Sequence, residues 1–507
     1  MQEQVLTFTN PGTGQVFGQT PVATSDEVRQ AVQEMRQRFP AWSGKSIRER
    51  IRILRKFQAL LIDRQDEITQ VINQDCGKTR QDAILELFVT IYNLDETCRK
   101  APGWLKTEHV SPGIYFFKKC AIEHRPHGVT AVIAPWNYPF ALSLPPVFAA
   151  LIAGNTVVLK PSELTAATGE LIRSLIESLP DLAPYARVVQ GDGRTGAALI
   201  AAEPDYIFIT GSTPTGRKVM QAASERLIPA ACELGGKDAM IVLEDADLDS
   251  AARWGAWGAY FNAGQTCMSV ERVYVVEPVY DEFLRLALQY TGEFKTGYSS
   301  QYESDFTVGP LTDPRQAEII QSHLDDALAK GARLLTGGKR DAQFFDPMVV
   351  VDVDHSMLLM QEESFGPFLP IMKVRDEAEA IRLANDNAFG LGASVWGRDV
   401  AHALEVARKI EAASIIINDS IAQFGMPMMP FGGVKGSGFG RTHGREGLTQ
   451  FTRPYSYVAG NPPLAWDIAT ILRKPGNYHT GAALTGLLFG RTWAQRIKAF
   501  KQLFNRP

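Results

Sequence analysis

The sequence predicts an α/β protein made of two successive α/β domains, and three observations support this prediction. Short runs rich in β-branched residues alternate with helical stretches from Gly128 onward. A second alternation begins near Ala239 and ends with the run IIIND at 415–419. Such alternation is typical of right-handed βαβ crossovers around a buried parallel sheet. The length of 507 residues allows roughly three structural units and a sizeable core.

The segment before about residue 110 is predicted to be mostly helical. Apolar residues recur there at three- and four-residue spacing, which is typical of amphipathic helices. We expect packing helices without a chemical role, followed at 113–124 by an extended segment suited to a hairpin arm. The two apolar series are Ile51, Leu54, Phe57 and Leu61, and Ile84, Leu87, Phe88 and Ile91.

The stretch 128–159 contains no charged residue, a property that it shares with membrane-spanning segments. It also contains prolines at 135, 139, 145 and 146. A helix across those positions would lose backbone hydrogen-bond donors and clash repeatedly. We therefore expect a buried strand, a turn and a short buried helix.

The two alternations supply the remaining elements in chain order. In the first, strands are expected at 128–134, 155–160, 186–191 and 206–210, and helices at 142–153, 168–179 and 215–227. In the second, strands are expected at 239–244 and 271–277, with one helix through Trp254 and Phe261 and another through Phe283.

Composition excludes several classes of protein. Lys and Arg number 52 against 56 Asp and Glu, a net charge of −4, so the chain has no overall basic field for nucleic acid. Five cysteines, never spaced as CxxC, indicate free thiols in a reducing compartment. The first residues lack the features of a secretory signal, and we expect a cytoplasmic location. The histidines show no metal-ligand spacing, so no metal site is expected.

Two strand ends carry residues suited to a dinucleotide. Gly211 to Gly216 follows the strand 206–210 and opens a helix, so it offers N–H groups and a positive dipole to a pyrophosphate. Thr213 replaces the usual middle glycine, and a plain strand-to-helix turn is an equally good interpretation. Glu163, with Lys160, could accept ribose hydroxyls and would repel a 2′-phosphate, which favours NAD over NADP. A solvated Lys–Glu pair is the alternative.

Three further side chains form a coherent catalytic set. Cys267 lies among small polar residues, Glu233 stands beside two glycines between the two α/β regions, and Asn137 follows another strand. They would supply a nucleophile, a base for water and a donor for an oxyanion. Plainer interpretations are a buried structural cysteine, a surface ion-pair partner and a turn residue.

Seven short motifs are spread over the chain. They are Ala134–Phe140 (APWNYPF), Leu159–Glu163 (LKPSE), Thr210–Thr213 (TGST), Glu233–Lys237 (ELGGK), Gly264–Cys267 (GQTC), Glu362–Pro367 (EESFGP) and Pro430–Gly438 (PFGGVKGSG). In this combination and order, over about residues 5–458, they resemble the signatures of the aldehyde dehydrogenase superfamily. The combination is far more specific than any one motif.

The resemblance implies a role for individual residues. Cys267 would be the nucleophile and Glu233 the general base, and the Asn137 amide with the Cys267 backbone N–H would form the oxyanion hole. NAD, with NADP as the alternative, would be the cofactor. Its adenosine ribose would be held by Lys160 and Glu163, its pyrophosphate by Gly211 and Ser212, and its nicotinamide end by Glu363 and Phe365, with Trp136 and Leu234 as further contacts.

The resemblance also implies an aldehyde dehydrogenase-like architecture: a Rossmann-like cofactor domain, an α/β catalytic domain and a small β arm that joins subunits into homodimers or homotetramers. The expected boundaries are 1–112 and 128–232 for the NAD-binding domain, 233–430 for the catalytic domain, 113–127 and 431–458 for the oligomerisation arm, and 459–507 for a basic amphipathic tail.

The implied reaction is oxidation of an aldehyde to a carboxylic acid through a thiohemiacetal and a thioester on Cys267. Glu233 would activate the water that hydrolyses the thioester. Relatives that transfer the acyl group to coenzyme A tend to lack this glutamate, so Glu233 favours hydrolysis. A structural homologue without activity is disfavoured because the cysteine, the glutamate and the asparagine are all present.

The C-terminal residues 463–507 depart from the family's usual ending. They contain seven Lys or Arg and one acidic residue, and Trp493, Ile497, Phe500 and Phe504 recur at helical spacing. We expect a cationic amphipathic segment at an anionic membrane surface, with a helix docked on protein as the alternative.

The substrate is the least determined part of the prediction. Resemblance to membrane-associated fatty aldehyde dehydrogenases favours a medium- or long-chain aliphatic, or another apolar, aldehyde. The loop Ala422–Met429, with Met268 and Phe424, is expected to line its path and is apolar. A semialdehyde with a distal carboxylate, such as succinate semialdehyde, is the alternative.

Overall fold

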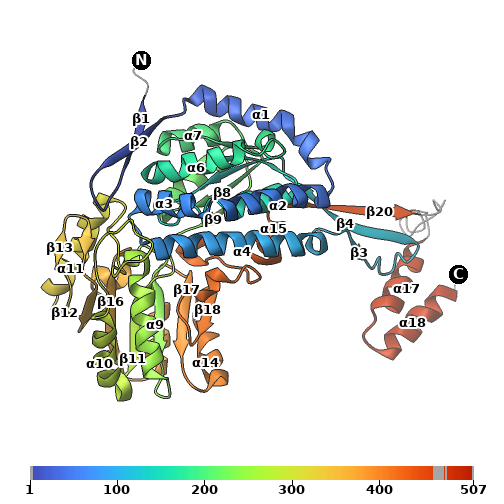
Figure 1. Cartoon of the computed structure of the whole chain (residues 1–507). Coiled ribbons are helices and arrows are strands. Elements are labelled where there is room, and N and C mark those ends of the chain that lie inside the picture. The colour runs from blue at the N-terminus through green and yellow to red at the C-terminus, as the bar shows by residue number, and fades with distance from the viewer. Residues whose placement is uncertain (1–3, 461–472, 474–476, 505–507) are drawn as a thin grey trace. The chain divides into compact units, whose positions relative to one another are not determined.

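The computed structural model describes residues 4–460, 473 and 477–504 (Figure 1). The chain forms two compact units. The main unit comprises residues 1–106 and 124–453, and the second unit comprises residues 107–123 and 454–507. The predicted tail, 459–507, lies partly outside the described residues, at 461–472, 474–476 and 505–507.

A six-stranded sheet organises the first half of the main unit. Five of its strands pair in parallel, and the short sixth strand, β19, pairs with one edge in antiparallel orientation. Alternate residues of β8 face two different helix layers, as expected for a doubly wound sheet: Phe208 joins one buried cluster and Ile207 the other. In spatial order the strands are β19 (Gly438–Phe439), β9 (Ala230–Glu233), β8 (Tyr206–Thr210), β5 (Val129–Ile133), β6 (Thr156–Lys160) and β7 (Ala186–Val188).

Helices cover both faces of this sheet. On one face α2 and α4 run side by side, and on the other α1, α7 and α8 pack against the strands (Figure 1). Local sequence fixes the helix ends, because Thr24 and Ser46 form capping boxes with Glu27 and Glu49, and α3 ends at Gly77 in the left-handed conformation. The helices are α1 (Ser25–Ser43), α2 (Ile47–Asp63), α3 (Gln65–Cys76), α4 (Arg80–Trp104), α5 (Leu144–Ala153), α6 (Ala166–Glu177), α7 (Gly193–Ala201) and α8 (Thr213–Ser224).

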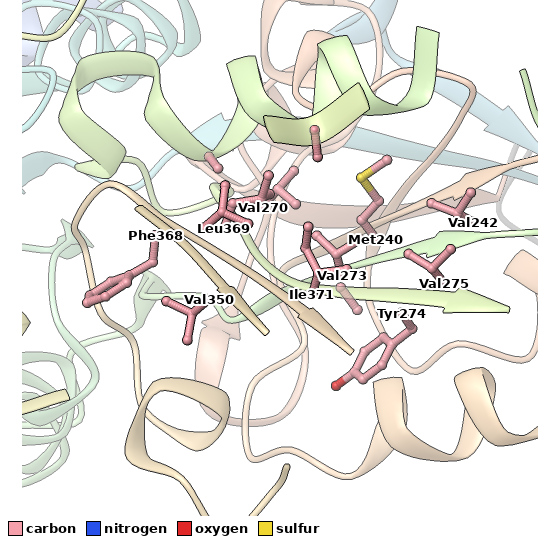
Figure 2. Close-up of a cluster of buried hydrophobic side chains, with 14 of the residues drawn as sticks. Met240, Val242, Val270, Val273, Tyr274, Val275, Val350, Phe368, Leu369 and Ile371 are labelled. Atoms are coloured by element: carbon pink, nitrogen blue, oxygen red, sulfur yellow. The ribbon is translucent and has the colours of Figure 1, made fainter. Parts of the chain in front are cut away.

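A seven-stranded sheet organises the second half of the main unit. Six of its strands pair in parallel, and β12 is antiparallel at one edge. Buried side chains such as Met240, Val273 and Ile371 from adjacent strands pack together in its core (Figure 2). In spatial order the strands are β12 (Arg333–Thr336), β15 (Met348–Val351), β16 (Phe368–Val374), β11 (Val270–Val276), β10 (Asp238–Val242), β17 (Gly392–Trp396) and β18 (Ser414–Ile417).

Shorter elements complete the main unit. The α-helices around the second sheet are α9 (Leu248–Tyr260), α10 (Tyr280–Thr291), α11 (Pro314–Ala329), α12 (Leu358–Gln361), α13 (Glu377–Asn385) and α14 (Val400–Ala407), and α15 (Gly444–Thr449) follows β19. Two hairpins are β1 (Val5–Thr9) with β2 (Val16–Pro21) and β13 (Arg340–Asp341) with β14 (Phe344–Phe345). Short 3-10 helices are η1 (Glu163–Thr165), η2 (Ala183–Tyr185), η3 (Phe261–Gly264), η4 (Glu277–Val279), η5 (Ala422–Gly425) and η6 (Lys435–Ser437).

A three-stranded sheet lies mostly in the second unit. Its order is β20 (Thr452–Gly460), β4 (Lys118–Pro126) and β3 (Glu108–Val110). In the second unit the helices α17 (Tyr478–Phe489) and α18 (Trp493–Phe504) pack closely, because Gly486 and Ala499 meet where a Cβ on Gly486 would lie 2.6 Å from the Ala499 Cβ. Among the described residues, no helix has the length and apolar character needed to cross a membrane.

The structure confirms the predicted secondary structure at most positions. The uncharged stretch 128–159 forms β5, α5 and β6, all buried, and not a spanning helix. The extended segment near 113–124 ends in β4, one strand of the three-stranded sheet. Residues 431–449 lie with the main unit, where β19 pairs with β9. The predicted domain boundaries themselves stay a prediction.

A buried aromatic pair in the helical layer tests the packing of this fold. Phe57 on α2 is fully buried and meets Phe148 on α5 edge to face, with ring centroids 5.8 Å apart. Phe57→Ala should lower the free energy of unfolding by about 3–5 kcal/mol, because it removes an aromatic side chain and leaves a cavity. Ile62→Ala on the exposed side of the same helix should change it by less than about 0.5 kcal/mol. Urea unfolding followed by circular dichroism measures both, and equal losses would contradict the packing described.

Candidate active site

Parallel pairing brings several of the predicted site residues to one edge of the first sheet. Strands β5, β6, β8 and β9 run in the same direction. Their carboxyl ends lead into the segments that carry Asn137, Glu163, Ser212 and Leu234. The carboxyl edge of an open α/β sheet is where ligands bind in such folds.

The adenosine end predicted for a dinucleotide is built from two strand ends. Lys160, buried at the end of β6, places its Nζ 3.0 Å from Oε2 of Glu163 in η1. Ser212 caps α8, and its hydroxyl accepts a hydrogen bond from the Thr215 N–H. A Cβ on Gly211 would meet no atom within 4 Å, so the helix start is open on that side. An open helix N-terminus fits a pyrophosphate, and a carboxylate at another strand end of the same sheet edge fits a ribose.

Close packing fixes the chain that follows β9. A Cβ on Gly216 of α8 would lie 2.6 Å from Cδ2 of Leu234, so Leu234 fits against this helix only because residue 216 is glycine. A Cβ on Gly235 would lie 2.3 Å from Oε2 of Glu363, and the Gly236 N–H donates to Oε1 of the same carboxyl at 3.0 Å. Burial raises the pKa of Glu363 to about 8.

The segment around Phe365 is held at the same place. Phe365 adopts a left-handed backbone conformation with φ of 51°, and its ring lies 5.5 Å from that of Trp136, edge to face. The Ser364 and Phe365 N–H groups donate to the carboxylate of Glu271 at 2.9 and 3.1 Å. Glu271 also forms a buried ion pair with Lys237. The residues predicted for the nicotinamide end therefore meet the chain that follows Glu233.

Sequence reasoning gave no role to Glu271. It stands on the buried strand β11, in the run ERVYVV, where a charged residue among apolar ones is unusual. That signal was available in the sequence. Its partners were not, because Lys237 and Ser364 lie far from it along the chain.

A strained turn presents Cys267. Asn262, Ala263 and Gly264 all adopt positive φ, at 52°, 57° and 73°. A Cβ on Gly264 would lie 2.1 Å from the Gly366 carbonyl oxygen, so no other residue fits there. Left-handed non-glycine residues persist only where the surrounding structure enforces them, and they are concentrated at functional sites.

The Cys267 turn touches the other predicted catalytic segments. A Cβ on Gly236 would lie 2.3 Å from the Cys267 carbonyl oxygen, which places this turn directly against the ELGGK segment. The side-chain amide of Asn137 donates to the Gln265 carbonyl at 3.1 Å. The thiol packs against an apolar cluster. Its members are Met268, Leu391, Ile421 and Phe431, with Trp257, Phe261 and Phe424 partly buried against them.

Glu233 is a buried carboxyl whose two oxygens find no hydrogen-bond partner among the described residues. It ends β9, and its Oε1 would lie 2.7 Å from a Cβ on Gly432, where φ is 159°. Burial raises the pKa of Glu233 well above its usual value, and the positive charge of Arg441 opposes this only in part. An unpartnered buried carboxyl with a raised pKa is a good acceptor for a proton from water.

The environment of the thiol favours its neutral form. Burial raises the pKa of Cys267 above its ordinary value, and the carboxyls of Asp238, Glu363 and Glu233 raise it further. The segments that carry Cys267, Glu233 and Asn137 meet through the contact of Gly236 with the Cys267 carbonyl oxygen and the hydrogen bond from Asn137 to Gln265.

Comparison with known proteins identifies this arrangement. Residues 1–456 match the sequence pattern of the aldehyde dehydrogenase family. The chain belongs to the aldehyde dehydrogenase family. This confirms the resemblance that the seven motifs indicated, and with it the predicted α/β fold class.

Individual aldehyde dehydrogenase relatives cover nearly the whole chain. A 4,4'-diapolycopene aldehyde oxidase of Methylomonas sp is 42% identical over 97% of this chain and 94% of its own length. A Mycobacterium ulcerans protein, provisionally named an NADP(+) succinate-semialdehyde dehydrogenase 2, is 34% identical over 92% of this chain and 93% of its own. The crystal structure of an NAD-dependent aldehyde dehydrogenase from Sinorhizobium meliloti superposes with a TM-score of 0.86 at 32% identity, covering 92% of this chain and 93% of that one.

Family membership leaves the individual roles as predictions. The structure brings Cys267 and Glu363 to the segment that follows Glu233 and joins Asn137 to the Cys267 turn. It places Lys160, Glu163, Gly211 and Ser212 along the carboxyl edge of the first sheet. Within residues 4–460, 473 and 477–504, no three His, Cys, Asp or Glu side chains are grouped so that they could hold a metal ion.

The raised pKa of Glu233 predicts how pH affects stability. Between the pKa of Glu233 in the unfolded chain and its higher pKa in the folded protein, only the folded protein keeps the proton, so stability falls as pH rises. Glu233→Gln removes this penalty. We expect the variant to match the parent at acidic pH and to exceed it in stability by an amount that grows as the pH rises through neutral.

Thermal unfolding at a series of pH values measures this effect. Glu303→Gln, at an exposed loop position, is the matched control and should show no gain that grows with pH. A constant difference between Glu233→Gln and the parent at all pH values would contradict the buried, unpartnered state of Glu233.

Proposed function

We propose that the protein is an NAD-dependent aldehyde dehydrogenase that oxidises a medium- or long-chain, or otherwise apolar, aldehyde to the carboxylic acid. The observation that carries the proposal is the convergence of Cys267, Asn137 and Glu233 beside the Glu363 segment. Family membership supports the reaction class.

The proposed chemistry follows from these side chains. The Cys267 thiol loses its proton to Glu233 or to water, and the sulfur adds to the aldehyde carbon and leaves an oxyanion. Asn137 has a second amide N–H besides the one donated to Gln265, and with the Cys267 backbone N–H it would hold that oxygen. When bound, NAD supplies the acceptor for the hydride. Water deprotonated by Glu233 then hydrolyses the thioester on Cys267.

The choice of NAD over NADP rests on Glu163. Its carboxylate pairs with Lys160 at 3.0 Å and remains partly exposed, so it could accept the hydroxyls of a ribose. A 2′-phosphate would place a second negative charge against it. The Sinorhizobium structure is named NAD-dependent and the Mycobacterium ulcerans relative is named for NADP, so the family includes both preferences.

The apolar cluster around the thiol supports the proposed substrate. Trp257, Phe261 and Phe424 are only partly buried against it, and their rings are available to line a path for a hydrocarbon chain. Met426, Met428 and Met429, next along the chain, are exposed. The Methylomonas relative is named as an oxidase of 4,4'-diapolycopene aldehyde, and we propose an aldehyde substrate for this chain as well.

A succinate-semialdehyde activity is the second candidate, because the Mycobacterium ulcerans relative carries that name. It would bring a distal carboxylate toward a thiol whose pKa three carboxyls already raise. The apolar cluster offers such a group no favourable partner. We therefore propose the apolar aldehyde as substrate and hydrolysis, not transfer to coenzyme A, as the second step.

The second unit suggests how the protein assembles and where it acts. Strand β20 lies at an edge of the three-stranded sheet and is exposed along nearly all its length, which suits pairing into a homodimer or homotetramer. On α18, Trp493 is 81% exposed and Ile497 is exposed beside Lys498. Large apolar side chains beside cations suit an anionic membrane surface, and we propose peripheral contact there by a cytoplasmic enzyme.

Initial rates with a series of straight-chain aldehydes test the proposed activity. NAD reduction should require Cys267, and kcat/KM should rise with chain length because each buried methylene contributes about 0.8 kcal/mol. Cys267→Ala should abolish the reaction with every aldehyde. Cys120→Ala, at a partly exposed thiol on β4, should stay within about twofold of the parent.

The comparison substrate is succinate semialdehyde, and NADP is the comparison cofactor. Undiminished turnover by Cys267→Ala would overturn the proposed chemistry. A higher kcat/KM for succinate semialdehyde than for the longest aldehyde would overturn only the apolar substrate.

Flotation with phospholipid vesicles tests the membrane proposal. The protein should float with vesicles that contain phosphatidylglycerol and not with neutral vesicles, and binding should weaken as salt rises. Trp493→Glu and Lys498→Glu should each reduce flotation, whereas the charge reversal Lys339→Glu, at an exposed position of the main unit, should not. Equal flotation of all variants would contradict the proposal that α18 contacts the membrane.

A further inference from the structure

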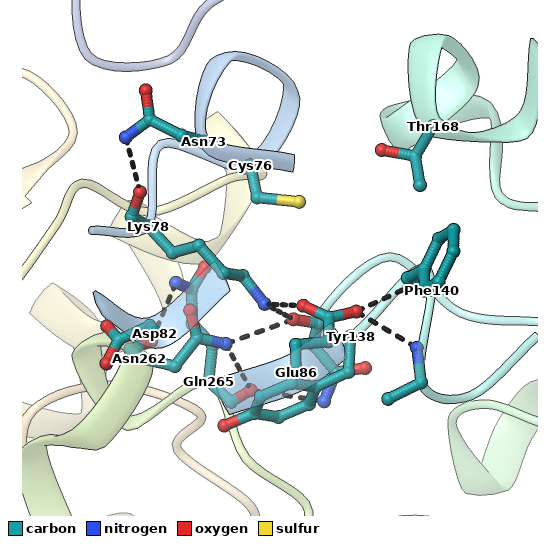
Figure 3. Close-up of polar contacts among 12 residues, drawn as sticks. Asn73, Cys76, Lys78, Asp82, Glu86, Tyr138, Phe140, Thr168, Asn262 and Gln265 are labelled. Atoms are coloured by element: carbon teal, nitrogen blue, oxygen red, sulfur yellow. Dashed lines mark hydrogen bonds and ion pairs between the residues drawn. The ribbon is translucent and has the colours of Figure 1, made fainter. Parts of the chain in front are cut away.

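A buried ion pair from the N-terminal helical layer holds the segment that carries Asn137. Lys78 lies between α3 and α4, and Glu86 is on α4. Both side chains are 0% exposed, and Lys78 Nζ lies 2.7 Å from Oε2 of Glu86 (Figure 3). Nothing in the chemistry proposed above uses either residue. Burying two charges costs free energy unless each finds further partners, so the partners indicate what the pair does.

The partners of the pair lie almost entirely in the segment 137–141. Lys78 Nζ donates to the Asn137 carbonyl oxygen at 2.8 Å and stands 4.2 Å from the centre of the Tyr138 ring. Oε1 of Glu86 accepts from the Phe140 N–H at 2.8 Å and from the Ala141 N–H at 3.1 Å. The pair thus fixes the backbone that directly follows the Asn137 side chain, from the Asn137 carbonyl to the Ala141 N–H.

The same carbonyl oxygen joins this segment to the Cys267 turn. Besides Lys78, the side-chain amide of Asn262 donates to the Asn137 oxygen, at 3.1 Å. Asn262 is the first of the three left-handed residues before Cys267. The Tyr138 hydroxyl adds a second link at 2.7 Å to the Thr266 hydroxyl. The Lys78 ammonium group and the Cys267 turn therefore bind the same carbonyl oxygen of the segment that carries the Asn137 amide.

We propose that Lys78 and Glu86 are a positioning pair that sets the Asn137 amide relative to Cys267. The inference rests on the proposed function, in which that amide holds the oxyanion. Neither residue would touch the substrate. Misplacement of a catalytic group by about 1 Å can cost about 100-fold in rate, so loss of the pair should appear in kcat.

The test is a double-mutant cycle on kcat with a long-chain aldehyde. Lys78→Met/Glu86→Gln removes both charges together, because a lone buried charge would destabilise the protein. We expect kcat to fall about 10- to 100-fold while KM for NAD stays within about twofold. Asn137→Ala should cost about 100- to 1,000-fold, and adding the pair substitution to it should cost no more than about a further twofold.

Two controls separate positioning from stability. Arg50→Met removes another buried cation of the helical layer, one that donates to the Ile152 and Lys45 carbonyls away from this segment. It should lower the unfolding temperature without changing kcat per titrated thiol. If the double substitution does not fold, Glu86→Asp keeps both charges but withdraws the carboxylate from the Phe140 and Ala141 N–H groups, and it should lower kcat several-fold. An unchanged kcat in folded Glu86→Asp would equally contradict the positioning role.

The outcomes distinguish the inference from the proposed function. An unchanged kcat in the folded pair variant, or a full repeated loss in the Asn137→Ala background, would overturn the positioning role. Full activity of Asn137→Ala itself would instead overturn the role of that amide in the proposed function.

Discussion

The close approach of the segment after β9 to the Cys267 turn is the constraint on which the candidate site depends. Gly235 and Gly236 have no side chains, and a Cβ at either would overlap Glu363 or the Cys267 carbonyl oxygen. Without this approach, the proposed base Glu233 from the first sheet and the Cys267 thiol beside the second would be separated by a layer of side chains. Two sheets with independent cores can therefore contribute to one candidate site.

Buried charge organises the surroundings of this contact. Glu233 is left without hydrogen-bond partners, whereas Glu271 and Glu86 are each neutralised by a lysine and accept backbone N–H groups. The difference is physical: partnered carboxylates hold loops in place, and an unpartnered one retains the capacity to take a proton. The arrangement gives up stability at one position, which the raised pKa of Glu233 records.

Sequence patterns predicted most elements of the fold because hydrophobic periodicity and helix-capping residues are local signals. The strands β5, β6, β7, β8, β10 and β11 and the buried nature of 128–159 followed from them, whereas the short strand β9 was not predicted. The candidate site was predicted from motifs, each of which names a residue without its partners. Lys78, Glu86 and Glu271 could not be assigned in this way, since their roles come from backbone groups up to 94 positions distant.

The left-handed residues before Cys267 make one part of the candidate site rigid, whereas the methionine-rich segment beside it can change its packing. Asn262, Ala263 and Gly264 hold the backbone of the Cys267 turn in one conformation. Phe424 packs against the same apolar cluster as Cys267, and the exposed methionines that follow it at 426, 428 and 429 have long, unbranched side chains that repack readily. Evolution of new substrate ranges on this scaffold should therefore accumulate changes in that methionine-rich segment while the cysteine turn stays fixed.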